Sequence, residues 1–321
     1  MTNLEGRTIL VTGSTDGVGR VVAQKLAESG AHIVVHGRNQ DRGERLVDSI
    51  QAGGRGAATF YRADFAVLAE VRRLADEIRH NFGRIDILIN NAGIGSGGRD
   101  ATRQMSADGY ELRFAVNYLS GFLLTRLLLP LLMQSKPARI INVASLGQHP
   151  IDFKDVMLTH GYSGSRAYAQ SKLAQIMFTF DLAQELEASN VTANCLHPAT
   201  YMNTTMVRQA GVTPISTTDE GATAILNLAV AAPLDQQTGL FFNGLNPSRA
   251  NPQAYDLHAR EQLRGLSLAS SLPDWLESVS FRGFYSTTGN RNFKQRGPFG
   301  FRTSRPSCRF RARRAQQSIC P

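Results

Sequence analysis

The feature that most constrains the fold of this chain is a glycine-rich turn near the N-terminus, between an apolar run and a helical pattern. The run Ile9, Leu10, Val11 leads into residues 12–19, whose glycines are spaced G-x-x-x-G-x-G, and a helical pattern covers residues 20–29. Glycines let the backbone approach a pyrophosphate, and the start of a helix presents free N–H groups to negative charge. The segment predicts a dinucleotide-binding unit; an ordinary glycine-rich turn is the alternative.

Apolar strand-like runs alternate with helical patterns along most of the chain. The runs lie at residues 8–11, 32–36, 58–61, 85–90, 139–144, 191–196 and 240–243. Parallel strands need crossover connections, so this alternation predicts a parallel sheet with helices on both faces. We expect an α/β, single-domain Rossmann fold over residues 1–272, with a doubly wound, mostly parallel sheet of seven strands. The cofactor should lie at the carboxyl ends of the strands.

Tyr168 and Lys172 stand four residues apart in a helical run and therefore share one face. A phenol has an ordinary pKa of ~10, and a fixed positive charge nearby favours the phenolate and lowers that value. The pair predicts a general acid or base, whereas a solvated aromatic with a nearby lysine is the structural alternative. Tyr162 competes, but its fourth following residue is Arg166, so Tyr168 is preferred.

The end of the second strand bears on the choice of dinucleotide. Enzymes that prefer NAD usually carry an acidic residue there for the ribose 2′-hydroxyl, but this chain has Gly37 followed by Arg38. A guanidinium can pair with a 2′-phosphate, which a carboxylate would repel. The sequence favours NADP(H), and NAD(H) with a solvated Arg38 is the alternative.

With these motifs in order, the chain resembles the short-chain dehydrogenase/reductase family, and more narrowly its retinol-dehydrogenase-like branch and similar bacterial oxidoreductases. The resemblance covers about residues 5–270. It is carried by residues 12–19, Asp64, the run Asn90-Asn91-Ala92-Gly93, Asn117, Ser145, the Tyr168/Lys172 pair and the run His197-Pro198-Ala199-Thr200. The resemblance implies an NADP-dependent oxidoreductase that interconverts a carbonyl and an alcohol on an apolar small molecule. An NAD-dependent dehydrogenase and a non-catalytic dinucleotide-sensing or scaffold protein are the alternatives.

The resemblance also implies roles for individual residues. Tyr168 would be the general acid/base, Lys172 would lower its pKa and bond the nicotinamide ribose, Ser145 would hold the substrate oxygen, and Asn117 would anchor a water. Asp64 would bond the adenine. The expected cofactor-binding residues are Gly13, Ser14, Thr15, Asp16, Gly17, Val18, Gly19, Arg38, Asp64, Phe65, Asn90, Ala92, Gly93, Tyr168, Lys172, Pro198 and Thr200.

Residues 148–165 separate Ser145 from the Tyr168 helix as an extra segment. An insertion beside the reacting tyrosine is a natural substrate-side loop. Its apolar side chains, Ile151, Phe153, Met157 and Leu158, suggest an apolar wall.

The helix that carries Tyr168 has two apolar stripes, where a surface helix would have one. The second consists of Ala174, Phe178, Leu182 and Leu186. We expect it to meet another subunit in a homodimer, with core burial as the alternative. Residues 119–133 are almost wholly apolar but too short to span a bilayer, so a buried helix is expected there.

No signal peptide is recognised, and the three cysteines suit a reducing compartment, so we expect a cytoplasmic protein. No spacing of His or Cys predicts a metal site. The net charge of +9 arises at the C-terminal end, because ten of the 35 basic residues and no acidic residue lie after residue 280. We expect residues 273–321 to be a basic, disordered extension or a shifted reading frame. Nucleic-acid binding by this segment is the less favoured interpretation.

Overall fold

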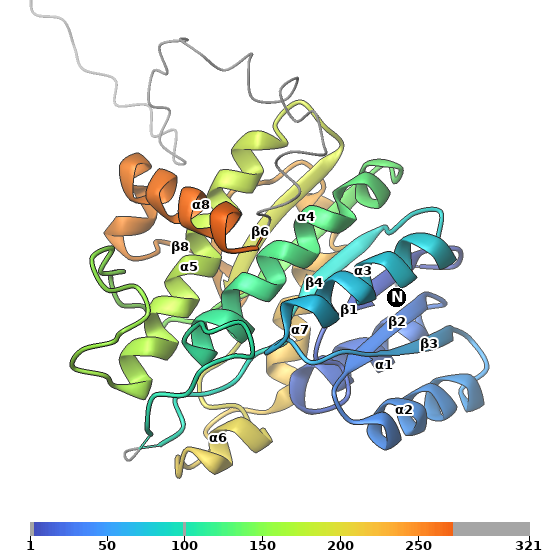
Figure 1. The fold of residues 1–321 in the computed structure, drawn as a ribbon. Coiled ribbons are helices and arrows are strands. Elements are labelled where there is room, and N and C mark those ends of the chain that lie inside the picture. Colours follow the sequence, from blue (N-terminus) through green and yellow to red (C-terminus); the bar gives the residue numbers. More distant parts are fainter. Residues whose placement is uncertain (1–2, 99–100, 272–321) are drawn as a thin grey trace, which may run out of the picture. The chain divides into compact units, whose positions relative to one another are not determined.

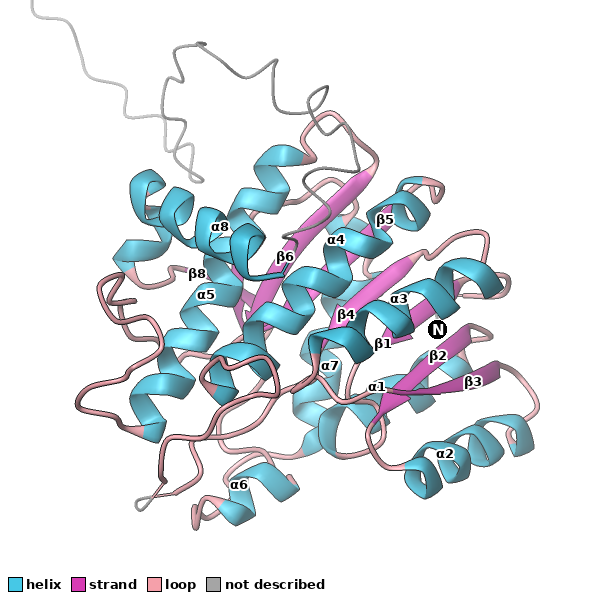
Figure 2. Ribbon diagram, in the orientation of Figure 1, coloured by secondary structure: helices cyan, strands magenta, loops and turns pink. Residues whose placement is uncertain are grey.

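The computed structural model describes residues 3–98 and 101–271. This part of the chain contains one sheet, with the strand order β3-β2-β1-β4-β5-β6-β7-β8 (Figure 2). All neighbouring strands are parallel except β7 and β8. The doubly wound α/β fold is confirmed, with one short antiparallel strand beyond the seven expected. That strand, Asn246–Ser248, escaped prediction because Asn and Pro are depleted in strands.

The strands are β1 Thr8–Val11, β2 His32–Gly37, β3 Ala57–Arg62, β4 Ile87–Asn90, β5 Ala138–Val143, β6 Val191–His197, β7 Phe241–Asn243 and β8 Asn246–Ser248. The α-helices are α1 Gly17–Glu28, α2 Gln40–Ala52, α3 Leu68–Asn81, α4 Ser120–Met133, α5 Gly164–Glu185, α6 Thr205–Gln209, α7 Thr218–Val230 and α8 Leu257–Ser271. A π-helical turn, η1 Phe114–Leu119, precedes α4, and the 3-10 turns are η2 Ala232–Leu234 and η3 Pro252–Tyr255.

Helices cover both faces of the sheet. The helices α3, α4 and α5 lie on one face, while α1 and α7 pack against each other on the opposite face (Figure 1). A parallel sheet covered in this way has strands that are apolar along their whole length. Accordingly, every residue of β4 and β5 is buried.

The order of the strands reverses between β1 and β4. Val11 at the end of β1 pairs with Ile89 near the end of β4. The glycine-rich turn and residues 90–93 therefore leave the sheet side by side at its carboxyl edge. In open α/β sheets, ligands bind in the crevice at this reversal.

The start of α5 sets the position of the expected acid/base pair. Ser163 caps the helix, because its side chain accepts a hydrogen bond from the Arg166 backbone N–H. The helix begins at Gly164, so Tyr168 and Lys172 lie in its second and third turns.

The second apolar stripe of α5 is buried within the chain. The Phe178 ring lies 5.0 Å from the Phe122 ring and 6.4 Å from the Tyr118 ring, measured between centroids. Helix α8 also docks here, where Arg260 pairs with Asp181 at 3.3 Å. The inference that this stripe meets another subunit is therefore wrong, since α4, η1 and α8 already bury it. The homodimer itself stays a prediction.

Residues Phe114–Met133 form the one helix in the described part of the chain that is long and apolar enough to cross a membrane. Inside the fold, 72% of the most apolar window of this helix is buried. This burial agrees with the expected core helix. The expected basic extension at residues 273–321 lies outside the described residues.

Candidate active site

The glycine-rich turn after β1 passes close to the loop after β4. Gly13 and Gly17 have φ angles of +64° and +55°, a region that disfavours side chains. A Cβ on Gly13 would lie 2.8 Å from the Ala92 Cα, and a Cβ on Gly19 would lie 2.5 Å from the Gly13 carbonyl oxygen. Larger residues cannot occupy positions 13 and 19 without moving backbone. The turn leads into α1, whose N-terminus is capped by the Asp16 side chain through a bond from the Gly17 N–H at 2.7 Å.

Two side chains that the sequence analysis did not assign hold this turn in place. The Thr12 hydroxyl accepts hydrogen bonds from the backbone N–H groups of Asn91 (2.9 Å) and Ala92 (3.0 Å). The Asn91 side-chain amide donates to the carbonyl oxygens of Thr12 (2.9 Å) and Gly13 (3.2 Å). Both residues lay inside recognised motifs, but only the neighbouring positions of β1 and β4 show that they bind each other.

A basic hollow lies beside the turn, lined by Thr15, Asp16, Arg20, Arg42 and Arg45. Arg42 pairs with the Asp16 carboxylate at 3.1 Å. The three arginines belong to no motif in the sequence, because the fold brings α1 and α2 together from separate segments. Their charge favours an anion in the hollow.

Arg38 and Asp64 also lie near each other. The Arg38 side chain is 67% exposed, and its Nη1 lies 3.9 Å from the Asp64 Oδ2. The Asp64 carboxylate also accepts from the Ala66 backbone N–H at 2.9 Å. Both side chains remain accessible to a ligand.

Ser145 and Tyr168 converge at Gly147. A Cβ on Gly147 would lie 3.5 Å from the Ser145 Oγ and 3.7 Å from the Tyr168 Cε1. The Gly147 backbone N–H donates to the Ser145 Oγ at 3.0 Å, which leaves the hydroxyl proton free to donate elsewhere. Burial raises the pKa of Tyr168, and a hydrogen bond with Ser145 lowers it in part.

Lys172 lies behind the Tyr168 ring, with its Nζ 5.8 Å from the ring centroid. The ammonium donates to the Val143 carbonyl oxygen and to the Gln175 Oε1, both at 2.9 Å. Burial lowers the pKa of Lys172 to about 7. The expected lowering of the Tyr168 pKa by Lys172 stays a prediction. Burial dominates at both groups, and the opposing contribution at Tyr168 comes from Ser145.

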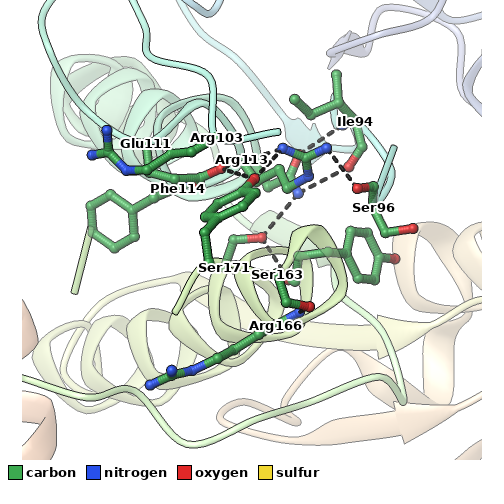
Figure 3. Close-up of polar contacts among 12 residues, drawn as sticks. Ile94, Ser96, Arg103, Glu111, Arg113, Phe114, Ser163, Arg166 and Ser171 are labelled. Carbon is green, nitrogen blue, oxygen red and sulfur yellow. Dashed lines mark hydrogen bonds and ion pairs between the residues drawn. The ribbon is translucent and has the colours of Figure 1, made fainter. Parts of the chain in front are cut away.

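Asn117 lies in the π-helical turn and binds the loop after β4. Its Oδ1 accepts from the Ile94 backbone N–H at 2.7 Å, and its Nδ2 donates to the Ile94 carbonyl at 3.1 Å and the Ser171 Oγ at 2.9 Å (Figure 3). A Cβ on Gly93 would lie 3.2 Å from the Asn117 Oδ1 and 3.5 Å from the Lys172 Nζ. Gly93, Asn117 and Lys172 thus lie close together beside the π-helical turn that carries Asn117. Such turns are frequent at functional sites.

Tyr162 belongs to a different cluster. The Arg113 guanidinium donates to the Tyr162 hydroxyl at 2.6 Å and to the Ser96 carbonyl at 2.7 Å, and the Tyr162 hydroxyl donates to the Glu111 Oε1 at 3.0 Å (Figure 3). Burial, followed by the Glu111 charge, raises the pKa of Tyr162 to about 12. Tyr162 thus binds Arg113 and Glu111, and Arg113 in turn binds the loop at Gly95 and Ser96, while Tyr168 lies with Ser145.

Several expected cofactor residues turn their side chains into the protein. The Asn90 Nδ2 donates to Thr125 (2.9 Å) and Asn142 (2.8 Å) in the interior, and the contact of Asn90 with a cofactor stays a prediction. Ser14, Val18, Phe65 and Pro198 are also buried. The backbone N–H of Ser14 is also bonded inside the fold, to the His36 carbonyl oxygen at 3.0 Å.

The carboxyl end of β6 completes the site. The His197 Nε2 lies 3.0 Å from the Thr200 Oγ1. Burial lowers the pKa of His197, and the charge of Lys172 lowers it further, which links this strand end to the lysine. Thr200 is exposed at the rim.

The model of the family described as short chain dehydrogenase matches residues 7–213. The chain belongs to the short-chain dehydrogenase family. Within it, the chain is 35% identical over 298 residues to retinol dehydrogenase 13 from Homo sapiens, covering 87% of this chain and 88% of the relative. It is 33% identical over 290 residues to retinol dehydrogenase 14 from Mus musculus, covering 82% and 85% respectively.

Solved structures agree with this assignment. An uncharacterized protein from Mycobacterium paratuberculosis aligns with a TM-score of 0.70 at 29% identity, covering 84% of this chain and 95% of that one. A short chain dehydrogenase from Escherichia coli, complexed with NADPH, aligns with a TM-score of 0.62 at 26% identity, covering 75% and 98%. This short-chain dehydrogenase is therefore an NAD(P)-dependent oxidoreductase of CH–OH groups, similar to the retinol dehydrogenases.

The residues of this short-chain dehydrogenase fit a dinucleotide. Gly13 lies close to Ala92, and Gly19 lies close to Gly13, so a Cβ at either glycine would fill the space that the turn leaves. The basic hollow lies beside this turn. In the segment 148–165, Ile151 and Leu158 are buried while Phe153 and Met157 are half-buried. In the described part of the chain no group of three His, Cys, Asp or Glu side chains could hold a metal ion, and Cys195 is a buried thiol.

Proposed function

We propose that this short-chain dehydrogenase interconverts a carbonyl and an alcohol on an apolar small molecule, with NADP(H) as its cofactor and Tyr168 as the general acid/base. The observation that carries the proposal is the convergence of Ser145 and Tyr168 at Gly147, with the Lys172 ammonium behind the ring. When bound, the dinucleotide supplies or accepts the hydride.

The side chains of the site have different roles in the reaction. In the reducing direction, negative charge grows on the carbonyl oxygen, and the Tyr168 hydroxyl gives it a proton while the Ser145 hydroxyl donates a hydrogen bond. The raised pKa of Tyr168 keeps the phenol protonated at neutral pH, as a general acid requires. Lys172, whose Nζ lies 5.8 Å from the Tyr168 ring centroid, would bond the ribose of the cofactor. Asn117 fixes the loop after β4 through its two hydrogen bonds to Ile94.

The preference for NADP(H) is supported by the end of β2. A Cβ at residue 37 would lie 2.5 Å from the Thr15 Oγ1 and Cγ2, so an acidic side chain cannot enter there unless Thr15 moves. The exposed Arg38 and the basic hollow beside it offer positive charge to a 2′-phosphate. Two similar short-chain dehydrogenases were solved with NADPH or NADP bound.

An apolar substrate is supported by the residues around Ser145 and Tyr168. The neighbouring Leu146 is exposed, as is Tyr201 beyond the end of β6, and the segment 148–165 adds half-buried Phe153 and Met157. Exposed large apolar side chains of this kind suit a hydrophobic ligand. The names of the relatives point to a retinoid-like alcohol or aldehyde as the first compounds to assay.

The direct test is the oxidation of NADPH with a panel of apolar aldehydes and ketones, followed for the wild type and Tyr168→Phe. Loss of a general acid is expected to lower the rate by ~10²–10⁴-fold. Tyr61→Phe is the matched control, because it removes a phenolic hydroxyl that bonds Asn81 from β3, outside the site. Equal rates in wild type and Tyr168→Phe would refute the mechanism. NADPH binding without turnover on any substrate would favour a dinucleotide sensor, and a higher kcat/KM with NADH would refute the cofactor assignment.

The homodimer and the cytoplasmic location stay proposals that rest on the sequence. Light scattering at micromolar concentration tests the first, and a monomer would refute it. Fractionation of cells that express the full chain tests the second, and recovery in the membrane fraction would refute it.

A further inference from the structure

His36 is buried at the end of β2, between two loops of the proposed cofactor site. The side chain is 2% exposed. Its Nδ1 accepts a hydrogen bond from the Gly13 backbone N–H at 3.1 Å, and its Nε2 lies 3.2 Å from the Ala63 carbonyl oxygen. The imidazole therefore bridges the glycine-rich turn after β1 and the loop after β3.

These two partners fix the protonation state of the ring. A backbone N–H can only donate and a carbonyl oxygen can only accept, so Nδ1 carries no proton and Nε2 carries one. Burial lowers the pKa of His36 to about 4, against the opposing effects of the Ala63 bond and the Asp64 charge. His36 is consequently a neutral imidazole in a single tautomer at physiological pH.

Further contacts tie His36 to the same loops. Its ring stacks on the Phe65 ring with 4.3 Å between centroids and 26° between planes. Its carbonyl oxygen accepts from the Ser14 backbone N–H at 3.0 Å, and its own N–H donates to the Ser14 Oγ at 3.0 Å. Ring and backbone together hold the turn at Gly13 and Ser14 and the loop that carries Asp64.

We propose that His36 is a positioning residue for the dinucleotide, which preorganises the glycine-rich turn and the adenine-side loop before the cofactor binds. The proposal rests on the proposed function, because it assumes that these loops bind NADP(H). The Gly13 N–H is already bonded to the His36 imidazole, so this hydrogen bond shapes the turn. A glycine-rich turn that is not held beforehand must become ordered when the dinucleotide binds. The free-energy cost of that ordering weakens the affinity for the dinucleotide.

Two substitutions separate the two hydrogen bonds. An asparagine Oδ1 can stand near the position of Nδ1, so His36→Asn keeps the acceptor for Gly13 and loses the donor to Ala63. A glutamine Nε2 can stand near the position of the imidazole Nε2, so His36→Gln keeps the donor and loses the acceptor. His80→Gln, at an exposed histidine on α3, is the matched control.

Binding of NADPH and of NADH is measured by fluorescence titration for each protein. We expect His36→Gln to weaken both by roughly tenfold, since a buried N–H loses its acceptor, and His36→Asn to weaken them less. Because His36 holds loops common to both dinucleotides, the factor should be the same for each. The KM for NADPH should rise more than kcat falls. His80→Gln should match the wild type.

The outcomes distinguish the two proposals. A wild type that binds neither dinucleotide refutes the proposed function. A wild type that binds, with His36→Gln binding equally well or losing affinity for NADPH alone, refutes the role of His36. Should both variants fail to fold, nitrogen NMR of histidine-labelled wild type decides. An Nε2–H tautomer from pH 8 to pH 5.5 that responds to added NADPH supports the role, and protonation above pH 6 or no response to NADPH overturns it.

Discussion

Replacing Lys172 by methionine should stabilise the fold while it abolishes turnover. Burial lowers the pKa of Lys172 from its ordinary value of 10.5 to about 7. At ~1.36 kcal/mol per pH unit, holding this ammonium inside the protein costs ~5 kcal/mol when it is fully charged and ~4 kcal/mol at pH 7. Methionine fills a similar volume without a charge, so this cost disappears.

The substitution also removes a donor from two acceptors. The Val143 carbonyl and the Gln175 side chain each receive a hydrogen bond from the Lys172 ammonium, and their loss offsets ~2–3 kcal/mol. The net expectation at pH 7 is a variant more stable than wild type by ~1–2 kcal/mol. A gain in the free energy of unfolding is unusual for such a substitution, because most substitutions of buried residues destabilise the fold.

The pH dependence gives the sharper test. The folded-state pKa lies below the unfolded value, so between pH 7 and pH 10.5 the unfolded chain binds more protons and wild-type stability rises with pH. Lys172→Met lacks this contribution, and its advantage should fall by ~3 kcal/mol between pH 7 and pH 9.5. Urea unfolding curves at several pH values measure both proteins.

The control is Lys25→Met, at a partly exposed lysine that pairs with the exposed Asp219. Its stability should stay within ~0.5 kcal/mol of wild type. A Lys172→Met variant that is less stable than wild type at pH 7, or whose difference from wild type is constant with pH, would refute the reasoning. Turnover should be lost in either case, because the ammonium behind the Tyr168 ring is gone.

Three further perturbations test the other parts of the site. Gly13→Ala should abolish NADPH binding in calorimetry, whereas Gly161→Ala, also at a positive φ but in open space, should cost only ~1 kcal/mol of stability and bind normally. Ser145→Ala should lower kcat/KM by ~10²–10³-fold and move the rising, low-pH limb of the pH–rate profile for alcohol oxidation to higher pH, because Ser145 lowers the pKa of Tyr168; an unmoved limb contradicts this. Glu111→Ala should destabilise the fold by ~3–5 kcal/mol in urea unfolding, since it leaves a buried arginine without its carboxylate, and a loss below ~1 kcal/mol would argue against that ion pair.

The parts of the fold that depend on neighbouring residues in the sequence could be predicted. The glycine spacing gave the turn at Gly13 and Gly17, and the four-residue spacing on one helix placed Tyr168 and Lys172 on one face. The alternation of strands and helices predicted the doubly wound sheet. Each of these signals comes from a periodicity or a backbone requirement that a short segment carries by itself.

What could not be predicted depends on contacts between distant segments. The direction in which burial moves the pKa of Lys172 requires knowledge of what surrounds it. The inward turn of Asn90 depends on Thr125, and the arginines of the basic hollow come from two helices. The apolar stripe around Phe178 predicts that another element packs against it. Only the fold shows that α8 and α4 are those elements. Periodicity specifies a face but not its partner.

The crowding between Gly37 and Thr15 limits the routes by which this enzyme could exchange one dinucleotide for the other. An aspartate introduced first at residue 37 would collide with Thr15 and distort the phosphate turn, so it would damage binding of both cofactors. Shortening Thr15 to alanine beforehand removes the two atoms 2.5 Å from a Cβ at residue 37 and leaves the Cβ of residue 15 at 3.1 Å, a contact that a shift of a few tenths of an ångström relieves. Redesign of the ribose preference is therefore a two-step path in which the order of the substitutions decides whether a working intermediate exists.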